Sequence, residues 1–205
     1  MRWVIFCWSQ SPVPPKGLRP DDVIVCADSG MEYARRCGVV PSIVLGDFDS
    51  YYGTLPADVE VIRLPAEKDD TDAVFAARLG LERGVLEFLI AGGIGGRLDH
   101  TLGAVQTLNF LVSNGACASM SDGIQSVEVL NAPFSKEYTP DGSRYLSLLA
   151  LTPRVTGLTL KGFKYPLCDQ TLTYDFPLGV SNEIVAPTAT VSAQQGRLAV
   201  IRTTD

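Results

Sequence analysis

The sequence predicts an α/β domain built on a parallel sheet, followed by an antiparallel β-sandwich. In the first half, short apolar runs that end in glycine or aspartate alternate with helical periodicity, which is typical of strands and helices in a parallel sheet. After about Gly123, short runs rich in Val, Leu, Thr and Tyr are separated by Pro, Gly, Asn or Asp, which favours antiparallel strands. A small, polar segment at 115–125 predicts the boundary, so we expect domains 1–120 and 121–205.

Five apolar runs predict the strands of the first domain. They are Trp3 to Cys7, Val23 to Ala27, Ile43 to Leu45, Val59 to Leu64 and Leu86 to Ala91. A helix is expected between the last two runs, because Thr71 can cap its start and Gly84 can end it. A second helix is expected from about Thr101 to Ser113, before Gly115. Its predicted apolar stripe consists of Leu102, Val105, Leu108 and Val112.

The composition narrows the class of protein. The chain has 205 residues, 46% hydrophobic and 20% charged, which indicates a globular protein. Its 17 Lys and Arg against 23 Asp and Glu give a net charge of −6, which disfavours non-specific nucleic-acid binding. No apolar run reaches the roughly 18 to 20 residues that span a bilayer, and the opening apolar stretch is too short for a secretory signal. We therefore expect a cytoplasmic protein that binds neither membrane nor nucleic acid.

Cysteine and histidine are too few for the common metal sites. The five cysteines are an odd number with no C-x-x-C pair, which argues against a disulfide framework or a zinc knuckle. Cys7 and Cys26 lie in apolar runs and are interpreted as buried thiols. The one histidine, His100, excludes a multi-histidine metal site. Carboxylates are therefore the main candidates for the chemistry.

Aspartates follow the predicted strands, where an α/β sheet places its ligand crevice. They are Asp28, Asp47, Asp49, Asp72 and Asp99. In an extended segment, Asp47 and Asp49 project to the same side. Two carboxylates about 4 Å apart repel by roughly 4 kcal/mol at an effective dielectric near 20, so a cluster of them favours a bound cation. Magnesium fits best, because it takes oxygen ligands and completes its shell with phosphate oxygens.

Any single aspartate of this set is more simply explained as a helix cap or a turn residue. Five of them, all after strands, weaken that explanation. Asp69 and Asp70 are less informative, since one can begin the helix and the other can be solvated. Lys68 can supply a cation to a triphosphate, although a lone lysine is more often merely solvated.

A glycine-rich segment precedes the second helix and includes Gly93 and Gly95. Such a loop can direct backbone N–H groups and a helix N-terminus at phosphate. It matches neither the dinucleotide nor the Walker pattern. Arg97 follows it and can bind phosphate through two N–H groups, although a surface ion pair is an equally good explanation. His100 can contact phosphate or transfer a proton, or merely form a hydrogen bond at the helix start.

The second half offers one candidate ligand site. GFKYPL (162–167) and GVSNE (179–183) combine Tyr165, which can stack on a heteroaromatic ring, with Ser181 and Asn182, which can hydrogen-bond it. A pair of β-turns with a core tyrosine explains the same residues, and without further information it is the better explanation.

Taken in order, these segments resemble thiamine pyrophosphokinases (thiamine diphosphokinases). The resemblance rests on ADSG (27–30), GDFDS (46–50), KDDTD (68–72), GGIGGRLDH (92–100), GFKYPL and GVSNE, and it covers nearly the whole chain. It implies an α/β domain, a C-terminal β-sandwich and a homodimer whose active site lies between domains and across subunits. It also implies magnesium-dependent transfer of pyrophosphate from ATP to the hydroxyl of thiamine, giving thiamine diphosphate and AMP.

The resemblance also implies roles for individual residues. It assigns Asp28, Asp47, Asp49 and Asp72 to magnesium and the phosphates, and Arg97, Asp99 and His100 to the nucleotide and thiamine ends of the site. Thr71 matches a position near the transferred phosphates, and Lys68 stands where some members have glutamine. Ser181 and Asn182 match the thiamine-binding turn, and Tyr165 stands where tryptophan occurs in other members.

The thiamine hydroxyl needs a base, and the residues leave Asp72 and Asp99 as alternatives. Two rival functions remain. DFDS resembles the nucleophile motif of haloacid-dehalogenase-like phosphohydrolases, but there the motif ends the first strand, whereas here it follows the third apolar run. A non-enzymatic sensor of thiamine or nucleotide is the other rival, although so many acids around a phosphate site favour an enzyme.

Overall fold

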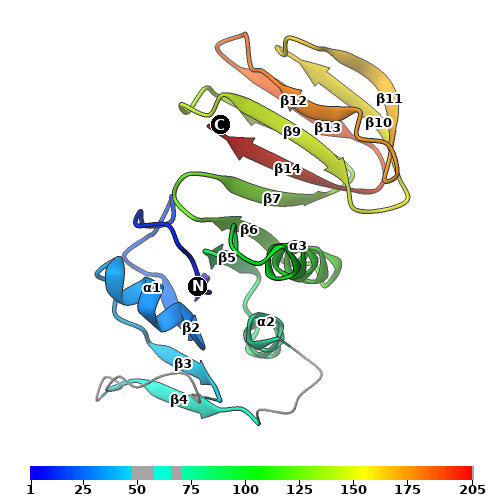
Figure 1. Cartoon of the computed structure of the whole chain (residues 1–205). Coiled ribbons are helices and arrows are strands. Elements are labelled where there is room, and N and C mark those ends of the chain that lie inside the picture. Colours follow the sequence, from blue (N-terminus) through cyan, green and yellow to red (C-terminus); the bar gives the residue numbers. More distant parts are fainter. Residues whose placement is uncertain (48–57, 66–70, 205) are drawn as a thin grey trace. The chain divides into compact units, whose positions relative to one another are not determined.

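The computed structural model describes residues 1–47, 58–65 and 71–204. The chain forms two compact units, Met1–Ile124 (unit 1) and Gln125–Asp205 (unit 2) (Figure 1). Unit 1 is an α/β unit with a parallel sheet, and unit 2 consists of antiparallel strands, which confirms the predicted fold class.

All strand pairs of the unit 1 sheet are parallel, and the strand order is β6-β5-β1-β2-β3-β4. The strands are β1 (Trp3–Phe6), β2 (Val23–Ala27), β3 (Ile43–Gly46), β4 (Glu60–Arg63), β5 (Glu87–Ala91) and β6 (Cys117–Ser121). Strand β1 therefore lies between β2 and β5, and the strand order reverses there. In open α/β sheets, ligands bind at the carboxyl ends of strands beside such a reversal.

Strand β6 lies inside the segment 115–125, where the boundary was predicted and no strand was expected. Its residues Cys117–Ser121 pair in parallel with the whole of β5. Small and polar residues have low β propensity, so only the pairing with a neighbouring buried strand makes this segment extended. The chain divides after Ile124, three residues beyond this strand.

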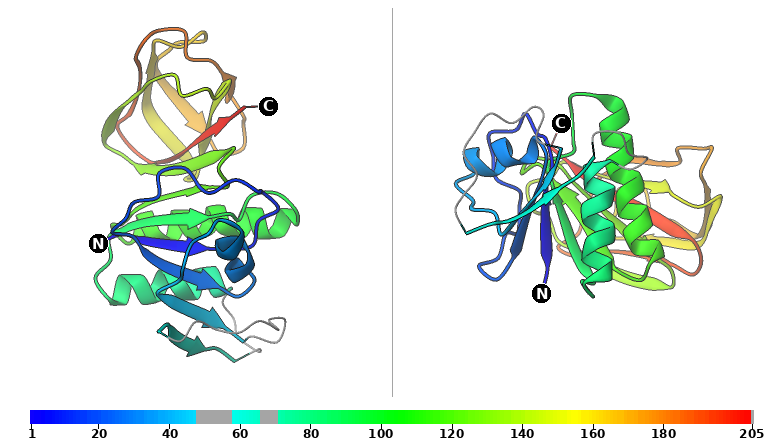
Figure 2. Two further views of the ribbon diagram at one scale, coloured as in Figure 1. Left: turned by 90° about the vertical axis from the view of Figure 1, so that its left-hand side faces the viewer. Right: turned by 90° about the horizontal axis from the view of Figure 1, so that it is seen from below.

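Helices cover both faces of the unit 1 sheet. α1 (Gly30–Arg36) lies on one face, and α2 (Asp72–Glu82) and α3 (Leu98–Ser113) lie on the other (Figure 2). The predicted start of α2 is confirmed, because Thr71 Oγ1 accepts a hydrogen bond from Val74 N–H at 3.3 Å. The short helix α1 was not predicted from the sequence.

The apolar stripe predicted for α3 is partly wrong. The helix begins at Leu98 rather than Thr101, and Leu102 is exposed. Its buried face instead contains Ala104 and Leu108. A Cβ at Gly93 would lie 3.1 Å from Ala104 Cβ, so the glycine loop approaches the helix where the side chain is small. Ala104, Leu108 and Leu111 lie on one face at helical spacing, and Leu102 is not on that face.

Unit 2 packs two antiparallel sheets around one apolar core, which confirms the predicted sandwich. The sheets have the orders β12-β9-β14-β7 and β11-β10-β13-β8. The strands are β7 (Ser126–Asn131), β8 (Phe134–Tyr138), β9 (Tyr145–Ala150), β10 (Arg154–Lys161), β11 (Leu167–Thr173), β12 (Gly179–Asn182), β13 (Ala189–Ala193) and β14 (Arg197–Thr203). Alternate residues face the core, as Leu146 and Leu148 do in β9 and Val191 does in β13.

Candidate active site

A cavity of about 420 Å³ lies in unit 1 at the carboxyl ends of β1, β2 and β5. This is the edge of the sheet where the strand order reverses. The cavity brings together many of the residues predicted for the site. These are Asp28, Thr71, Asp72, Gly93, Gly95, Arg97, Asp99 and His100.

Asp28 is held in an unusual conformation directly after β2. Its φ is +45°, in the left-handed region that is unfavourable for residues other than glycine. Backbone strain of this kind is frequent at functional sites. Its N–H donates to the carbonyl of Leu45 at 2.8 Å. Its Oδ1 is buried and accepts no hydrogen bond from any residue that the structure describes. A buried carboxylate oxygen without a partner is costly, so this oxygen is suited to a bound cation or donor.

The glycine of the ADSG segment has a packing reason. A Cβ at Gly30 would lie 1.9 Å from the carbonyl oxygen of Phe6, so α1 approaches β1 too closely for any side chain. This contact fixes the turn that carries Asp28 to the edge of the cavity.

Asp72 is the first residue of α2, where the helix dipole favours a negative charge, and its Oδ1 is buried. It lies near Cys7, which lines the same cavity. Burial and, second, the negative charge of Asp72 raise the pKa of the Cys7 thiol to about 12, so this thiol is neutral at physiological pH. Cys26 is fully buried as predicted, whereas Cys7 is half-buried and faces the cavity, which corrects its interpretation as a core thiol.

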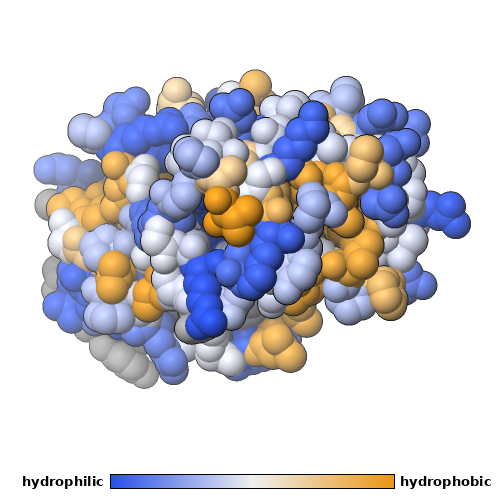
Figure 3. Space-filling model, turned by 90° about the horizontal axis from the view of Figure 1, so that it is seen from above, coloured by the Kyte–Doolittle hydropathy of each residue, from blue (hydrophilic) through white to orange (hydrophobic). Residues whose placement is uncertain are grey.

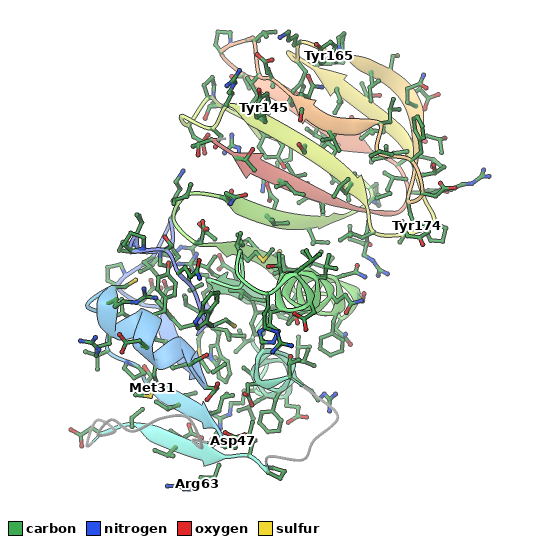
Figure 4. The ribbon with its side chains drawn as sticks, viewed as in Figure 1. Met31, Asp47, Arg63, Tyr145, Tyr165 and Tyr174 are labelled. Atoms are coloured by element: carbon green, nitrogen blue, oxygen red, sulfur yellow. The ribbon has the colours of Figure 1, made fainter. Side chains whose placement is uncertain are left out.

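Asp47 directly follows β3, next to the end of β4 (Figure 4). It is not among the residues that line the cavity. Asp49 and Lys68 lie outside the described residues. Within the described ranges, no group of three or more His, Cys, Asp or Glu side chains is arranged to hold a metal ion. The four-aspartate magnesium site therefore stays a prediction.

Arg97 and Asp99 form a two-point ion pair at the start of α3. Arg97 Nη2 lies 2.6 Å from Asp99 Oδ2, and Arg97 Nε lies 3.1 Å from Asp99 Oδ1. Both side chains are well exposed, so the pair leaves the guanidinium accessible at the cavity. The hydrogen bond from Arg97 holds the pKa of the Asp99 carboxyl below its usual range. Asp99 also accepts from the N–H of His100, which fixes the first turn of the helix.

Some backbone N–H groups of the glycine loop donate hydrogen bonds to other parts of unit 1. Gly93 N–H donates to the carbonyl of Trp8 at 3.0 Å, and Gly92 N–H donates to that of Ser121 at 2.9 Å. The prediction that Gly93 donates a hydrogen bond from its N–H group to phosphate therefore does not fit, because this N–H group already has a partner. Gly93 shapes the turn, with φ of +72°.

Trp8 lines the cavity and was not identified from the sequence. It follows β1, so its place at the carboxyl edge of a predicted strand was the available signal. Trp8 directly follows the apolar run Trp3 to Cys7, so the sequence suggested a core residue rather than a residue of the site.

In unit 2, hydrogen bonds join two of the predicted thiamine-binding residues, Tyr165 and Asn182. Asn182 is 5% exposed; its Nδ2 donates to the carbonyl of Tyr165 at 2.8 Å, and its Oδ1 accepts from Tyr165 N–H at 3.1 Å. The same Oδ1 accepts from Glu183 N–H at 2.9 Å. Tyr165 is 60% exposed, which contradicts its alternative interpretation as a core tyrosine. Ser181 is exposed in β12, with a φ of +61°.

Two family models match the chain. The model described as the thiamin pyrophosphokinase catalytic domain matches residues 16–117, and the model described as the thiamin pyrophosphokinase vitamin B1 binding domain matches residues 135–198. A thiamine pyrophosphokinase of Bacillus subtilis (strain 168) is 30% identical over 204 residues, which cover 93% of this chain and 95% of that protein.

Solved structures agree with the sequence comparisons. A crystal structure of thiamine pyrophosphokinase from Bacillus subtilis has a TM-score of 0.88 and 28% identity, with all of both chains covered. That of thiamin pyrophosphokinase from Geobacillus thermodenitrificans has a TM-score of 0.82 and 29% identity, with 100% of this chain and 98% of that chain covered. With the matched models and the relative, this shows that the chain belongs to the thiamine pyrophosphokinase family of enzymes.

Proposed function

We propose that this protein transfers the pyrophosphoryl group of ATP to the hydroxyl of thiamine, with magnesium. The observation that carries the proposal is the cavity of unit 1, where Asp28 and Asp72 meet the accessible guanidinium of Arg97. In the reaction, the thiamine hydroxyl oxygen bonds to the β-phosphorus of ATP. The bond from that phosphorus to the oxygen bridging the α-phosphate breaks. AMP leaves, and the hydroxyl proton passes to a carboxylate.

The residues of the cavity suit a hard cation. Carboxylate oxygens are the ligands that magnesium prefers, and the buried Oδ1 of Asp28 needs a partner. We assign Asp28 and Asp72 to the ion, together with Asp47 and Asp49 as predicted from the sequence. When bound, magnesium would neutralise charge on the phosphates and hold them in line for transfer.

The other cavity residues hold and orient the substrate. Arg97 binds phosphate oxygens through its planar fork of N–H groups, while Asp99 fixes its orientation. Thr71 and His100 line the same cavity and approach the phosphates. Arg97 lowers the pKa of the Asp99 carboxyl, which makes that carboxylate a poor proton acceptor. We therefore favour Asp72 as the group that accepts the thiamine proton.

Unit 2 is assigned to thiamine. Tyr165 offers an exposed ring for stacking, and Ser181 offers an exposed hydroxyl. Asn182 acts through Tyr165, because the oxygen and the nitrogen of its side-chain amide are both hydrogen-bonded to the backbone of that residue.

We also infer that the protein is a cytoplasmic homodimer. Free thiols at all five cysteines suit a reducing compartment. No helix in the described part of the chain is long and apolar enough to cross a membrane. Unit 2 exposes the large apolar side chains of Tyr174, Phe176 and Leu178, and Figure 3 shows hydrophobic residues among hydrophilic ones on the face that it draws. Exposed apolar side chains of this size are typical of association surfaces. Light scattering of the purified protein tests the dimer.

One assay tests the activity. Purified protein with thiamine, ATP and magnesium should form AMP and thiamine diphosphate in equal amounts, and omission of thiamine or addition of a chelator should stop both. Release of inorganic phosphate without AMP would favour the phosphohydrolase instead, although Asp47 follows the third strand and not the first. Binding of both substrates without turnover would indicate a sensor.

A further inference from the structure

Trp8 is an aromatic side chain without a role in the chemistry assigned above. The chain has two tryptophans. Trp3 is 2% exposed and belongs to the core of unit 1, whereas Trp8 is 38% exposed and lines the cavity. The carbonyl of Trp8 accepts the N–H of Gly93 at 3.0 Å, so its backbone is tied to the glycine loop.

The indole ring lies directly against that loop. A Cβ at Gly96 would lie 2.4 Å from Trp8 Cζ3 and 2.5 Å from Cη2, so only glycine lets the six-membered ring pack there. Gly96 precedes Arg97, which we assign to phosphate. A large aromatic surface is thus held beside a phosphate-binding cation, within one cavity.

We propose that Trp8 stacks on the base of the nucleotide that donates the pyrophosphoryl group. This inference rests on the proposed function. A nucleotide joins an anionic chain to a flat heteroaromatic ring, and the cavity offers Arg97 for the first and the indole for the second. Thiamine also carries aromatic rings. The vitamin B1 binding model, however, matches residues 135–198, whereas Trp8 belongs to the unit that contains the catalytic-domain match.

Stacking depends on ring area more than on hydrogen bonds to the base edge, because every base has a π-face. Purine nucleotides should therefore bind more tightly than pyrimidine nucleotides, while ATP and GTP should bind with similar affinity. Inorganic tripolyphosphate should bind without contacting the indole.

Tryptophan fluorescence tests the contact without turnover. ATP added with magnesium and without thiamine should quench the emission of the native protein, and tripolyphosphate should leave it unchanged. A Trp8→Phe variant keeps Trp3 as its one tryptophan, and ATP should not change its emission. Calorimetry on the same samples measures ATP binding directly.

Kinetics give an independent measurement. Trp8→Leu should raise KM for ATP about tenfold, equivalent to about 1.4 kcal/mol, with little change in KM for thiamine. Trp8→Phe should keep KM for ATP close to its native value, because phenylalanine keeps an aromatic ring. Leu86→Ala is the matched control, because Leu86 is 60% exposed just before β5, at the end of that strand opposite the cavity.

Each outcome decides the matter. Calorimetric binding of ATP without a change in Trp8 emission, or an unchanged KM for ATP in Trp8→Leu, overturns the stacking contact even if the protein makes thiamine diphosphate. Quenching by thiamine in the absence of ATP would show that a ring of thiamine, and not the nucleotide base, stacks on Trp8, which also overturns the proposal. If ATP quenches Trp8 but no AMP forms with thiamine present, the contact stands and the proposed function fails. Absence of ATP binding overturns both.

Discussion

Asp28 in unit 1 and Asn182 in unit 2 belong to segments that predicted ligand contacts, yet the structure uses them differently. Asp28 has a buried oxygen that accepts no hydrogen bond within the described residues. Asn182 is also polar and is almost fully buried, but the oxygen and the nitrogen of its side-chain amide both form hydrogen bonds to the backbone of Tyr165. A polar residue in a ligand-binding segment can therefore either face the ligand or build the support for its neighbour. The hydrogen bonds distinguish the two cases.

The largest effect is expected for Asp28→Asn. If its oxygen binds the cation, loss of the charge should lower kcat/KM about a thousandfold, equivalent to about 4 kcal/mol. The thermal midpoint should stay about the same, because Asp28 Oδ1 accepts no hydrogen bond from the described residues that the substitution could break. Formation of AMP and thiamine diphosphate measures the first effect, and calorimetry the second. Asp21→Asn is the exposed control. Near-native activity of Asp28→Asn would show that Asp28, like Asn182, is structural.

A structural carboxylate in the same unit sharpens the contrast. The side chain of Asp22 is 1% exposed and lies 2.6 Å from Arg2 Nη2. Asp22→Asn leaves Arg2 buried without its counter-charge and should lower the free energy of unfolding by about 3 kcal/mol at pH 7. Urea unfolding measures this, again with Asp21→Asn as control.

The same carboxylate predicts a pH dependence. Burial raises the pKa of Asp22, but the hydrogen bonds from Arg2 and Arg19 and their charges lower it more, so the pKa lies below its usual value. The stabilisation is therefore fully present above about pH 4, the pKa of the unfolded carboxyl, and is lost as the pH falls through the lower folded pKa. The stability difference between native protein and Asp22→Asn should shrink in that acid range. A difference that stayed constant would contradict the assignment.

Asn182→Ala tests the supporting side of the comparison. It leaves the N–H and carbonyl of Tyr165 without their partners, so the free energy of unfolding should fall by about 2 kcal/mol. KM for thiamine should rise far more than KM for ATP. Ser181→Ala is the matched control for stability, since Ser181 bonds to Ser147 Oγ through its backbone N–H, which the substitution keeps. Equal stability of the two variants would show that Asn182 is not a support.

The smallest effect is expected for Arg97→Lys. The pair with Asp99 is exposed, so the thermal midpoint should not change. A lysine cannot make two parallel hydrogen bonds to phosphate, so KM for ATP should rise a few-fold. Steady-state kinetics with varied ATP measures this. A large fall in stability would mean that Arg97 belongs to the scaffold.

Much of the site follows from strand ends that the sequence reveals. Asp28 and Asp72 are separated by several elements, but each was predicted near the carboxyl edge of one sheet, and parallel strands bring such residues together. Trp8 was missed because it directly follows the apolar run Trp3 to Cys7, where a tryptophan is most simply explained as part of the core. The role of Asn182 was missed because the bonds that occupy its amide depend on the folded position of Tyr165.

Parts of the fold depended on tertiary contacts. Strand β6, with its serine, alanine and cysteine residues, is extended because β5 lies beside it, and its composition resembles a linker. Helix α1 is only seven residues long, and its first residue, Gly30, is a poor helix former. In α3, Leu102 was expected inside because it is apolar, but the face that packs inward is the one that contains Ala104 and Leu111.

The position of β1 between β2 and β5 has a consequence for synthesis on the ribosome. Trp3 pairs with Val23 on one side and with Phe88 on the other, so one edge of the first strand stays open until a much later stretch has emerged. Closing such a long loop is slow, and an open apolar edge attracts other nascent chains. We expect chaperone dependence to end abruptly once β5 has left the exit tunnel.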